Sequence, residues 1–446
     1  MKKLKFIFYL LIVLSLIILV TASHIIYKRI NAYDEIKLKL QNILAYTSFP
    51  SYVESQEIPV FYHASHNCSA QLYRLDEKLI PAGPKIQLSS KIQNPNYSPV
   101  KGFNWDSPYL LSTKGLKSGY YLFKIKSDKS KEEFNLPIII TPSRSYKIAV
   151  IANTNTWQAY NTFGGRSYYT DYITPPYILP IYNKFPSLKP LSFLPFNRPY
   201  KEISEEFKNQ YNSFDNFDKL ENIKDFKLAN LGSTVMRGEW NLLGFFAKNK
   251  IDYGVYSDFD FCSNPNLNDA DIIFFHIHSE YWSEEMIGRL NQLIEKNKKI
   301  IFLSGNNMYR EIEYTEYGII VTKESIEENK TRSLCGAYYT DPVFPKIAAY
   351  RVINENHWVF EGCNLNRGSI FGKMGASGNE TDKIGFNTKG FNLLAVGTNY
   401  SGPAYMVIKE NDNGGFVFNA SSIMFAKCLQ KDTIINKIVL NLIKHN

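Results

Sequence analysis

The chain has 446 residues, of which 44% are hydrophobic and 15% aromatic, and its formal net charge is +9. This composition supports large buried cores and two or three domains, and it excludes a disordered chain. The lysines are spread along the sequence and form no basic block interleaved with aromatic residues, so we expect no nucleic-acid partner.

The first 23 residues have the pattern of a targeting segment. Three lysines among the first five residues precede an uncharged apolar run over residues 6–22. This run is at the short limit of a membrane span, and it ends in small residues that suit a signal-peptidase site. We therefore expect residues 1–23 to be a single-pass membrane anchor or a cleaved signal peptide. The body of the protein would then lie outside the cytoplasm, either held at the cell membrane or secreted or periplasmic.

Two further segments precede the main domain. Residues 24–50 are predicted to form a membrane-proximal helix that Pro50 ends. Residues 51–145 hold short runs rich in β-branched and aromatic residues, such as residues 119–127, separated by turn signals such as the Pro-Ala-Gly-Pro at 81–84. This spacing predicts a small antiparallel β-sandwich.

Residues 146–446 have the pattern of an α/β domain. Residues 271–277 and 299–303 are short apolar runs without alternation, as expected for strands that are buried on both faces. Between them lies an amphipathic helix, for which Ser283 is the predicted N-cap. This is a βαβ unit, and residues 147–152 add another strand of the same kind. We therefore expect a mostly parallel sheet.

The C-terminal third adds more strands, a hairpin turn at 411–415 and a closing helix over residues 433–444. Residues 171–235 are rich in Pro, Tyr and Asn and poorly periodic. A segment of this length is usually functional or wraps a site.

Polar side chains follow the two strands of the βαβ unit. His276, His278 and Glu280 come at the end of the first strand, and Asn306 follows the second. The carboxyl ends of parallel strands line one crevice, so these clusters should face each other. His278 and Glu280 could bind iron, zinc or manganese, whereas His276 lies within the strand and is better explained as a core histidine. The alternative is a polar loop with a Trp that fills the seam between helix and sheet.

Several catalytic arrangements are absent from the sequence. There is no G-x-S-x-G elbow and no Walker loop. Cys335 has no convincing strand before it, as a nucleophile on a strand-to-helix turn would need, so we interpret it as structural. The five cysteines include no C-x-x-C pair, which argues against a zinc knuckle.

Five motifs resemble those of the C-terminal domain of the large (beta) subunit of N,N-dimethylformamidase. They are T-W-Q-A-Y-N at 156–161, followed by Gly-Gly and S-x-Y at 164–169; L-S-F and N-R-P-Y at 191–200; H-S-E-Y-W-S at 278–283; L-S-G-N at 303–306; and G-N-E-T-D at 378–382. The resemblance covers about residues 146–422. The first and third motifs are the most specific.

The resemblance implies a glutamine-amidotransferase-like (flavodoxin-like) α/β domain. It also implies an amide hydrolase with one ferric iron (Fe3+) held by two tyrosines and a glutamate. By motif, Glu280 matches the glutamate ligand and Tyr160 matches one tyrosine, and Tyr200 is our candidate for the other. Such hard anionic ligands favour ferric iron.

The same resemblance assigns residues beside the metal. His278 and Asn306 match two of them, and Glu380 matches a second acidic residue of the site. Glu380 or His278 could move a proton, and Asn306 could donate a hydrogen bond to the developing oxyanion.

This chain departs from the family in ways that affect function. The family's enzyme is a larger cytoplasmic protein with a small partner subunit, whereas this chain begins with an export or anchor segment. We expect an amide substrate that is a small molecule or derives from the cell envelope, and we keep a homo-oligomer as an option. The alternatives are a non-catalytic glycan- or peptide-binding protein and a carbohydrate-active enzyme that pairs Glu280 with Glu380.

Overall fold

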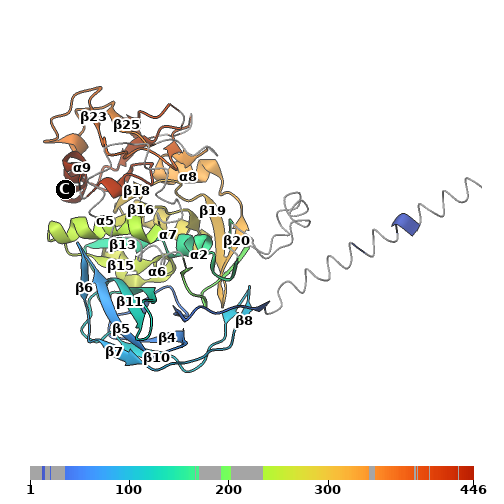
Figure 1. Cartoon of the computed structure of the whole chain (residues 1–446). Helices are drawn as coiled ribbons and strands as arrows, with labels where there is room; N and C mark the ends of the chain where they lie inside the picture. Colours follow the sequence, from blue (N-terminus) through green and yellow to red (C-terminus); the bar gives the residue numbers. More distant parts are fainter. Residues whose placement is uncertain are drawn as a thin grey trace, which may run out of the picture.

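The computed structural model in Figure 1 describes most of the chain from residue 36 onward. The described residues are 13–15, 21, 36–165, 167–169, 192–201, 235–340, 347–385, 388, 390–400, 402–429 and 431–445. Within this part of the chain, strand residues outnumber helical residues, and the strands form several separate sheets.

An N-terminal β unit, residues 36–141, lies at the bottom of Figure 1. Its strands are β1 (Ile36–Lys37), β2 (Ile43–Tyr46), β3 (Tyr52–Val53), β4 (Glu57–Ala64), β5 (Cys68–Leu75), β6 (Leu79–Pro81), β7 (Ile86–Leu88), β8 (Asn96–Ser98), β9 (Gly102–Phe103), β10 (Tyr109–Ser112), β11 (Gly119–Ser127) and β12 (Glu133–Thr141). One sheet has the order β10-β4-β2, and a second has the order β3-β12-β11-β5-β6 with β7 beside β5. Buried aromatic and aliphatic side chains of both sheets share one core.

The helix predicted for residues 24–50 is wrong in its described part. Residues 36–37 form β1, which pairs with β8, and residues 43–46 form β2, which pairs antiparallel with β4. All four residues of β2 are buried. The apolar side chains of this stretch therefore complete the core of the N-terminal β unit, and that tertiary burial overrides the local helical pattern.

A nine-stranded sheet forms the centre of the remaining chain, in the order β15-β13-β16-β18-β27-β26-β25-β22-β23. The bounds of its strands are β13 (Ile148–Ala152), β15 (Gly254–Ser257), β16 (Ile272–Ile277), β18 (Lys299–Ser304), β22 (Tyr350–Val352), β23 (Ile370–Phe371), β25 (Asn392–Gly397), β26 (Tyr405–Glu410) and β27 (Phe416–Asn419). The first five strands in this order run parallel, and the other four pairs are antiparallel.

The predicted fold class, a flavodoxin-like α/β domain with a mostly parallel sheet, is wrong. The turn that follows β26 returns the chain as a hairpin, so β26 is antiparallel to β27, and three more antiparallel strands extend that edge. A separate four-stranded mixed sheet has the order β14-β20-β19-β17, and β21 pairs with β24. The bounds of these strands are β14 (Phe193–Pro195), β17 (Tyr281–Trp282), β19 (Arg310–Tyr314), β20 (Gly318–Lys323), β21 (Tyr338–Tyr339) and β24 (Asp382–Lys383).

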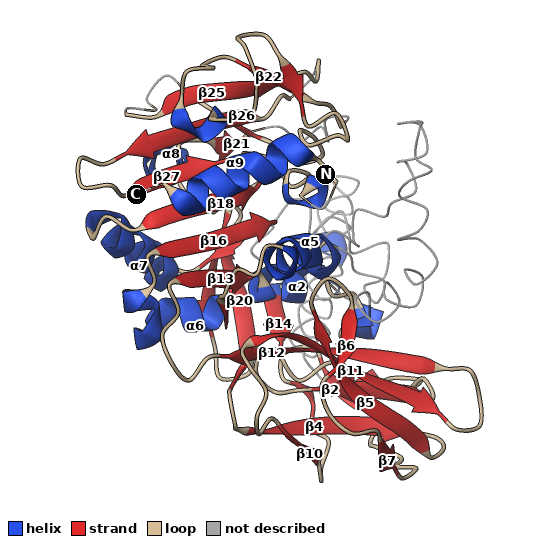
Figure 2. Ribbon diagram, turned by 90° about the vertical axis from the view of Figure 1, so that its left-hand side faces the viewer, coloured by secondary structure: helices blue, strands red, loops and turns tan. Residues whose placement is uncertain are grey.

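Helices cover both faces of the nine-stranded sheet (Figure 2). The α-helices are α2 (Thr154–Tyr160), α5 (Val235–Lys248), α6 (Asp258–Ser263), α7 (Glu284–Glu295), α8 (Glu328–Cys335) and α9 (Thr433–Lys444), and the short 3-10 helices are η2 (Phe163–Gly165), η8 (Pro265–Asp269), η9 (Trp358–Phe360) and η10 (Ala426–Cys428). Side chains of α5 and α9 share one core with the sheet, and those of α6, α7 and α8 share another. The central strands are therefore buried on both sides, which explains their unbroken apolar sequences.

The predicted βαβ unit is confirmed. Strands β16 and β18 are parallel neighbours joined through α7, and the Ser283 side chain accepts a hydrogen bond from the backbone N–H of Met286. Glu284 and Glu285 lie in the first turn of α7, where the helix dipole favours negative charge.

Two predictions concern residues that are mostly not described. Residues 1–23, the predicted anchor or signal peptide, lie outside the described residues except at positions 13–15 and 21, and residues 171–235 do so except at 192–201 and 235. In the part of the chain that the structure describes, no helix is both long and apolar enough to cross a membrane.

A buried polar network joins the N-terminal β unit to the large sheet. The carboxylate of Glu239 in α5 accepts hydrogen bonds from the Tyr120 hydroxyl (2.5 Å), Trp157 Nε1 (2.9 Å) and Asn153 Nδ2 (3.1 Å). His276 Nε2 lies 3.3 Å from the same Tyr120 hydroxyl. Burial raises the pKa of Glu239 to about 7 and lowers that of His276 to about 3, so His276 is a neutral core histidine at physiological pH.

The raised pKa of Glu239 predicts a specific pH dependence of stability. The folded state holds the Glu239 proton more tightly than the unfolded state, so stability should fall as pH rises from about 4.5 towards 7. Glu239→Gln removes this titration. The difference in unfolding free energy, variant minus wild type, should therefore rise by about 2–3 kcal/mol between pH 5 and pH 8. Urea denaturation followed by circular dichroism at each pH measures this difference.

The matched control is Glu57→Gln, because Glu57 is an exposed carboxylate on β4. The same pH series on this variant shows the effect of a Glu-to-Gln change outside the buried network. Parallel pH profiles for wild type and Glu239→Gln would contradict the raised pKa.

Candidate active site at the carboxyl edge of the sheet

The site begins at a strained turn that ends β16. Ile277 is fully buried and has φ 60°, a conformation that β-branched residues rarely adopt. The His278 N–H donates to the carbonyl of His276 over 2.8 Å, which closes a three-residue turn. Such strain costs about 1–3 kcal/mol and persists only where the surroundings impose it. The turn leads the chain sharply away from the strand, and His278 and Glu280 follow directly.

Neighbouring elements hold this turn in place. The Thr156 hydroxyl donates to the His278 carbonyl (2.9 Å), and the Gly305 N–H donates to the Ile277 carbonyl (3.2 Å). The Ile277 side chain packs so closely on α5 that a Cβ at Gly238 would lie 2.7 Å from its Cδ1 atom. The backbone that carries His278 and Glu280 is thus fixed from two sides.

Helix α2 places Tyr160, and it depends on another element for its N-terminus. Its own N-cap residue, Asn153, makes no capping hydrogen bond through its side chain. Instead, the Asp258 carboxylate accepts a hydrogen bond from the Asn155 N–H (2.8 Å), and the Asp258 N–H donates to the Thr154 hydroxyl (3.2 Å). This cap, supplied by the start of α6, satisfies a donor that a seven-residue helix leaves unpaired.

Glu280 is the centre of the site. It is 1% exposed, and the Tyr169 hydroxyl lies 2.7 and 2.8 Å from its two carboxylate oxygens. Arg310 Nε donates to Oε1 (2.9 Å), and the Tyr160 hydroxyl donates to Oε2 (3.3 Å). Tyr281, also buried, donates to the Tyr169 hydroxyl over 2.7 Å.

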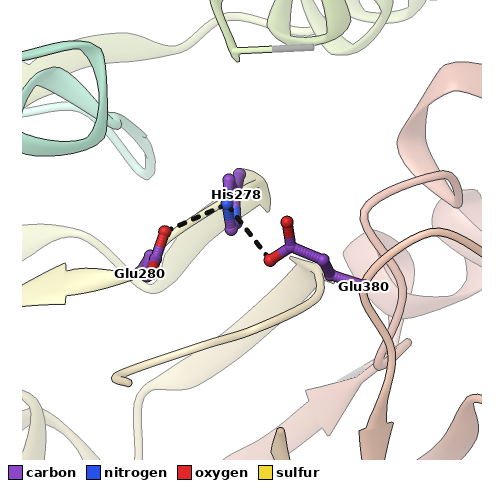
Figure 3. Close-up of side chains that lie close together, drawn as sticks. All are labelled: His278, Glu280 and Glu380. Atoms are coloured by element: carbon purple, nitrogen blue, oxygen red, sulfur yellow. Dashed lines mark ion pairs between the residues drawn. The ribbon is translucent and has the colours of Figure 1, made fainter. Parts of the chain in front are cut away.

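A second carboxylate approaches the same histidine. His278 Nε2 lies 3.2 Å from Glu280 Oε2 and 3.4 Å from Glu380 Oε2 (Figure 3). It also lies 2.9 Å from the Tyr160 hydroxyl. Asn306 Nδ2 donates to Glu380 Oε2 over 2.6 Å, and the buried Asn306 Oδ1 has no partner among the described residues. One open amide oxygen therefore remains beside Glu380.

The charges of the site follow from burial and pairing. Burial alone would raise the pKa of Glu280, but His278 and Arg310 lower it below its ordinary value, so this carboxylate is ionised. Burial raises the pKa of Glu380 above its ordinary value. Burial opposes the protonation of His278, yet Glu380 and Glu280 together raise its pKa to about 9. Burial and then the Glu280 charge raise the pKa of Tyr160 well above its usual range.

Of the six predicted site residues, the structure brings five together: Tyr160, His278, Glu280, Asn306 and Glu380. Tyr200 takes no part in this group. Its hydroxyl accepts a hydrogen bond from Gln158 Nε2 (2.5 Å), and its ring packs edge-on against Trp157.

Tyr169 occupies the position beside Glu280 that we predicted for Tyr200. It belongs to the S-x-Y part of the first motif, so the signal was present, but spacing gave no means of choosing between two tyrosines beside a Tyr-rich segment. Sequence reasoning placed Tyr281, a member of the motif at 278–283, at this edge of the sheet without a role, and it missed Arg310. Arg310 reaches Glu280 because its strand, β19, runs beside β17. No local sequence pattern predicts this strand pairing.

The oxygen atoms around Glu280 suit a small, hard cation. The hydroxyls of Tyr160 and Tyr169 lie 2.7–3.3 Å from the carboxylate oxygens of Glu280. With metal–oxygen bonds of about 2.0–2.2 Å, neighbouring ligand atoms are roughly 2.8–3.5 Å apart. Oxygen donors of this kind are the ligands of hard cations, and Arg310 would offset part of their negative charge.

The family model described as N,N-dimethylformamidase beta subunit-like, C-terminal, matches residues 74–437. The chain belongs to this family. The match is wider than the predicted 146–422, because it begins at the end of β5 and includes much of the N-terminal β unit. A dimethylformamidase-like family is consistent with a hydrolase. No curated protein is found to match the chain.

Solved structures show only weak similarity. The structure titled mmIFT52 N-terminal domain is 11% identical, with a TM-score of 0.27 over 43% of this chain and 83% of its own. A Bacteroides uniformis β-glucuronidase is 10% identical, with a TM-score of 0.13 over 61% of this chain and 41% of its own. A putative β-galactosidase from Bacteroides fragilis is 10% identical, with a TM-score of 0.12 over 64% and 49%. Scores this low support no conclusion about fold or activity.

Gly305 allows the loop that carries Glu380 to approach β18. A Cβ at Gly305 would lie 2.5 Å from the Glu380 carbonyl oxygen and 2.7 Å from the Ile423 nitrogen, both backbone atoms that cannot rotate away. Gly305→Ala should therefore lower the unfolding free energy by about 1–3 kcal/mol, as overpacking does. Urea denaturation measures this change.

Gly288 in α7 provides a control with the same substitution and the opposite expected sign. Nothing lies within 4 Å of a Cβ at this helical position. Gly288→Ala should raise stability by about 0.5–1 kcal/mol, because alanine loses less backbone entropy in a helix. Equal effects of the two substitutions would contradict the close approach at Gly305.

Proposed function

We propose that this protein is a metal-dependent hydrolase of an amide C–N bond, with ferric iron held by Tyr160, Tyr169 and Glu280. The observation that carries the proposal is the convergence of two tyrosine hydroxyls on one buried, ionised carboxylate. Membership of the dimethylformamidase-like family supports the reaction class. Tyr169 replaces Tyr200 in the proposed ligand set.

The donor set accounts for the chemistry of the proposal. When bound, ferric iron would polarise an amide carbonyl and lower the pKa of a water molecule. Arg310 holds Glu280 in its ionised form, ready to bind a cation. Tyr281 fixes the direction of the Tyr169 hydroxyl by donating to it.

Proton transfer is assigned to Glu380 and His278. Hydrolysis of an amide needs a base for the attacking water and an acid for the leaving nitrogen. Glu380 has a raised pKa and lies 3.4 Å from His278 Nε2, so the two can share one proton and release it to the amine. In the predicted role, Asn306 donates to the oxyanion. In the structure its Nδ2 already donates to Glu380. We therefore assign Asn306 a different role, in which its unpaired Oδ1 accepts a hydrogen bond from the N–H of a substrate amide.

The carbohydrate-active alternative loses support from the geometry. The nearest ligand atoms of His278, Glu280 and Glu380 all lie within 4.8 Å of one another. This spacing is shorter than the about 6.5–9.5 Å between the carboxyl groups of inverting glycosidases, but it is close to the about 5–5.5 Å of retaining ones. Arg310 and Tyr169 also occupy Glu280, which leaves it poorly placed as a nucleophile.

Other parts of the proposal concern where and on what the protein acts. We infer an amide substrate that is a small molecule or an envelope component, in keeping with the targeting pattern of residues 1–23. Attachment to a membrane, a location outside the cytoplasm and a homo-oligomeric state remain proposals. Fractionation of cells that express the full chain tests the first two.

The first test is the metal content and visible spectrum of the full chain. Near-stoichiometric iron with a tyrosinate-to-iron charge-transfer band is expected, and Glu280→Ala should lose the iron. Tyr169→Phe should retain iron but lose about half of the absorbance per iron, because one of two tyrosinate ligands is gone. Tyr200→Phe is the matched control and should leave the band unchanged. A folded protein that takes up no iron on reconstitution, or a band that depends on Tyr200 and not on Tyr169, would refute the assignment.

Glu380→Gln tests proton transfer separately from metal binding. The variant should keep its iron and its charge-transfer band, while kcat on any amide substrate found by screening should fall roughly 10²–10⁴-fold, the usual contribution of general acid–base catalysis. Loss of iron in Glu380→Gln would instead make Glu380 a ligand. An unchanged kcat would remove it from the reaction.

A further inference from the structure

The loop that joins the two tyrosines of the site is held by two parts of the molecule. Tyr160 ends α2, whose buried residues pack mainly in the cores beside the large sheet and beside β14 and β20, although Trp157 also contacts Tyr120 of the N-terminal β unit. Tyr169 lies nine residues later, after a loop that includes the short helix η2. The Tyr168 N–H donates to the Ala159 carbonyl of α2 (2.9 Å), so the far end of this loop is held by the helix that carries Tyr160. The middle of the loop, around Phe163, is held by a different part of the molecule.

The N-terminal β unit holds this loop through Phe163. The Phe163 side chain is buried, with its ring centre 5.7 Å from that of Phe103 and 6.0 Å from that of Tyr97, both in edge-on geometry. Among the described residues, Phe163 is the only buried member of the N-terminal core that comes from beyond residue 141. The side chain acts as an anchor that the loop inserts into another unit.

The next residue shows how close this contact is. Gly164 has φ 78°, and a Cβ there would lie 2.8 Å from Cε1 of the Tyr97 ring. Tyr97 and Phe103 are directly paired across the hairpin formed by β8 and β9. This hairpin, residues 96–103, thus receives Phe163 and also covers Gly164.

The same hairpin contacts a second loop beside the site. The Phe103 N–H donates to the Asn197 carbonyl over 2.7 Å, and a Cβ at Gly102 would lie only 2.2 Å from that carbonyl oxygen. Asn161 connects the two loops, because its Nδ2 donates to the Pro199 carbonyl and its Oδ1 accepts the Phe163 N–H. The hairpin and these hydrogen bonds fix both ends of the turn from which the chain proceeds to Tyr169.

We propose that the β8–β9 hairpin is a positioning element for the second tyrosine of the site, and that it acts through Phe163. In this view the N-terminal β unit completes the active site from a distance. Among the described residues, none of its side chains makes a hydrogen bond or an ion pair with Glu280. The family match supports this link, because it extends into the N-terminal β unit from residue 74. The inference rests on the proposed function for its metal readout but not for its structural one.

The structural test uses hydrogen–deuterium exchange of the full chain without added metal. Phe163→Ala should increase amide exchange over residues 165–169, since the loop loses its anchor. The matched control is Phe123→Ala, which removes another buried ring of the same core, one that stacks on Tyr109. It should lower the melting temperature without raising exchange at 165–169. Unchanged exchange there in Phe163→Ala, or an equal increase in both variants, would overturn the proposal. Phe163→Leu serves if the alanine variant does not fold.

The metal test uses the same variants loaded with iron. Phe163→Ala should lose about half of the charge-transfer absorbance per iron, as expected for Tyr169→Phe, because one tyrosinate ligand is displaced. The double variant Phe163→Ala/Tyr169→Phe should lose no more than either single variant, since both changes remove the same ligand. Full absorbance per iron in Phe163→Ala would overturn the positioning role. If the wild type binds no iron, the proposed function fails, and the exchange experiment alone decides this inference.

Discussion

The charge of Glu280 is the constraint on which the site depends. A carboxylate that is 1% exposed is several kcal/mol less stable than in water unless other groups compensate for it. Here the compensation comes from three places in the chain: Arg310 on β19, Tyr169 on the loop after η2, and His278 two residues earlier. Loss of any one of these partners would leave part of the charge unpaired. The network therefore specifies a single arrangement of loops that are far apart in the sequence, and it leaves two phenol oxygens and a carboxylate facing one another.

Unusual backbone conformations allow these loops to meet. Ile277 adopts a strained positive φ, and this conformation lets the chain leave β16 at a sharp angle. Gly305 has no side chain, and the backbone of Glu380 can therefore approach β18. Strain and close packing at the carboxyl edge of a sheet are common in active sites, because function there takes precedence over local preference. The edge predicted from the sequence is the right one, although the sheet to which it belongs is not the predicted sheet.

Much of the site could be predicted because its signals are local. Unbroken apolar strands such as β16 identify a buried sheet, and the polar residues that follow them, including His278 and Asn306, mark its edge. The order of strands, by contrast, is set by long-range pairing. Sequence patterns identified β25, β26 and β27 as strands. No local pattern predicted that they would pair antiparallel and extend the parallel part of the sheet. The same limit explains why Tyr200 was preferred to Tyr169 and why residues 43–46 were predicted as helix. In each case the outcome depends on burial against a distant part of the chain.

The capping of α2 by Asp258 has a consequence for the order in which the protein folds. A helix of seven residues is too short to persist alone in water, and α2 lacks a cap of its own. It becomes stable only when α6, about a hundred residues further along the chain, has docked beside it and brought its carboxylate to Asn155. Contacts of such long sequence separation form slowly. We therefore expect the geometry around Tyr160 to form late in folding. A nascent chain that ends before residue 258 has the first motif but not the carboxylate that caps its helix.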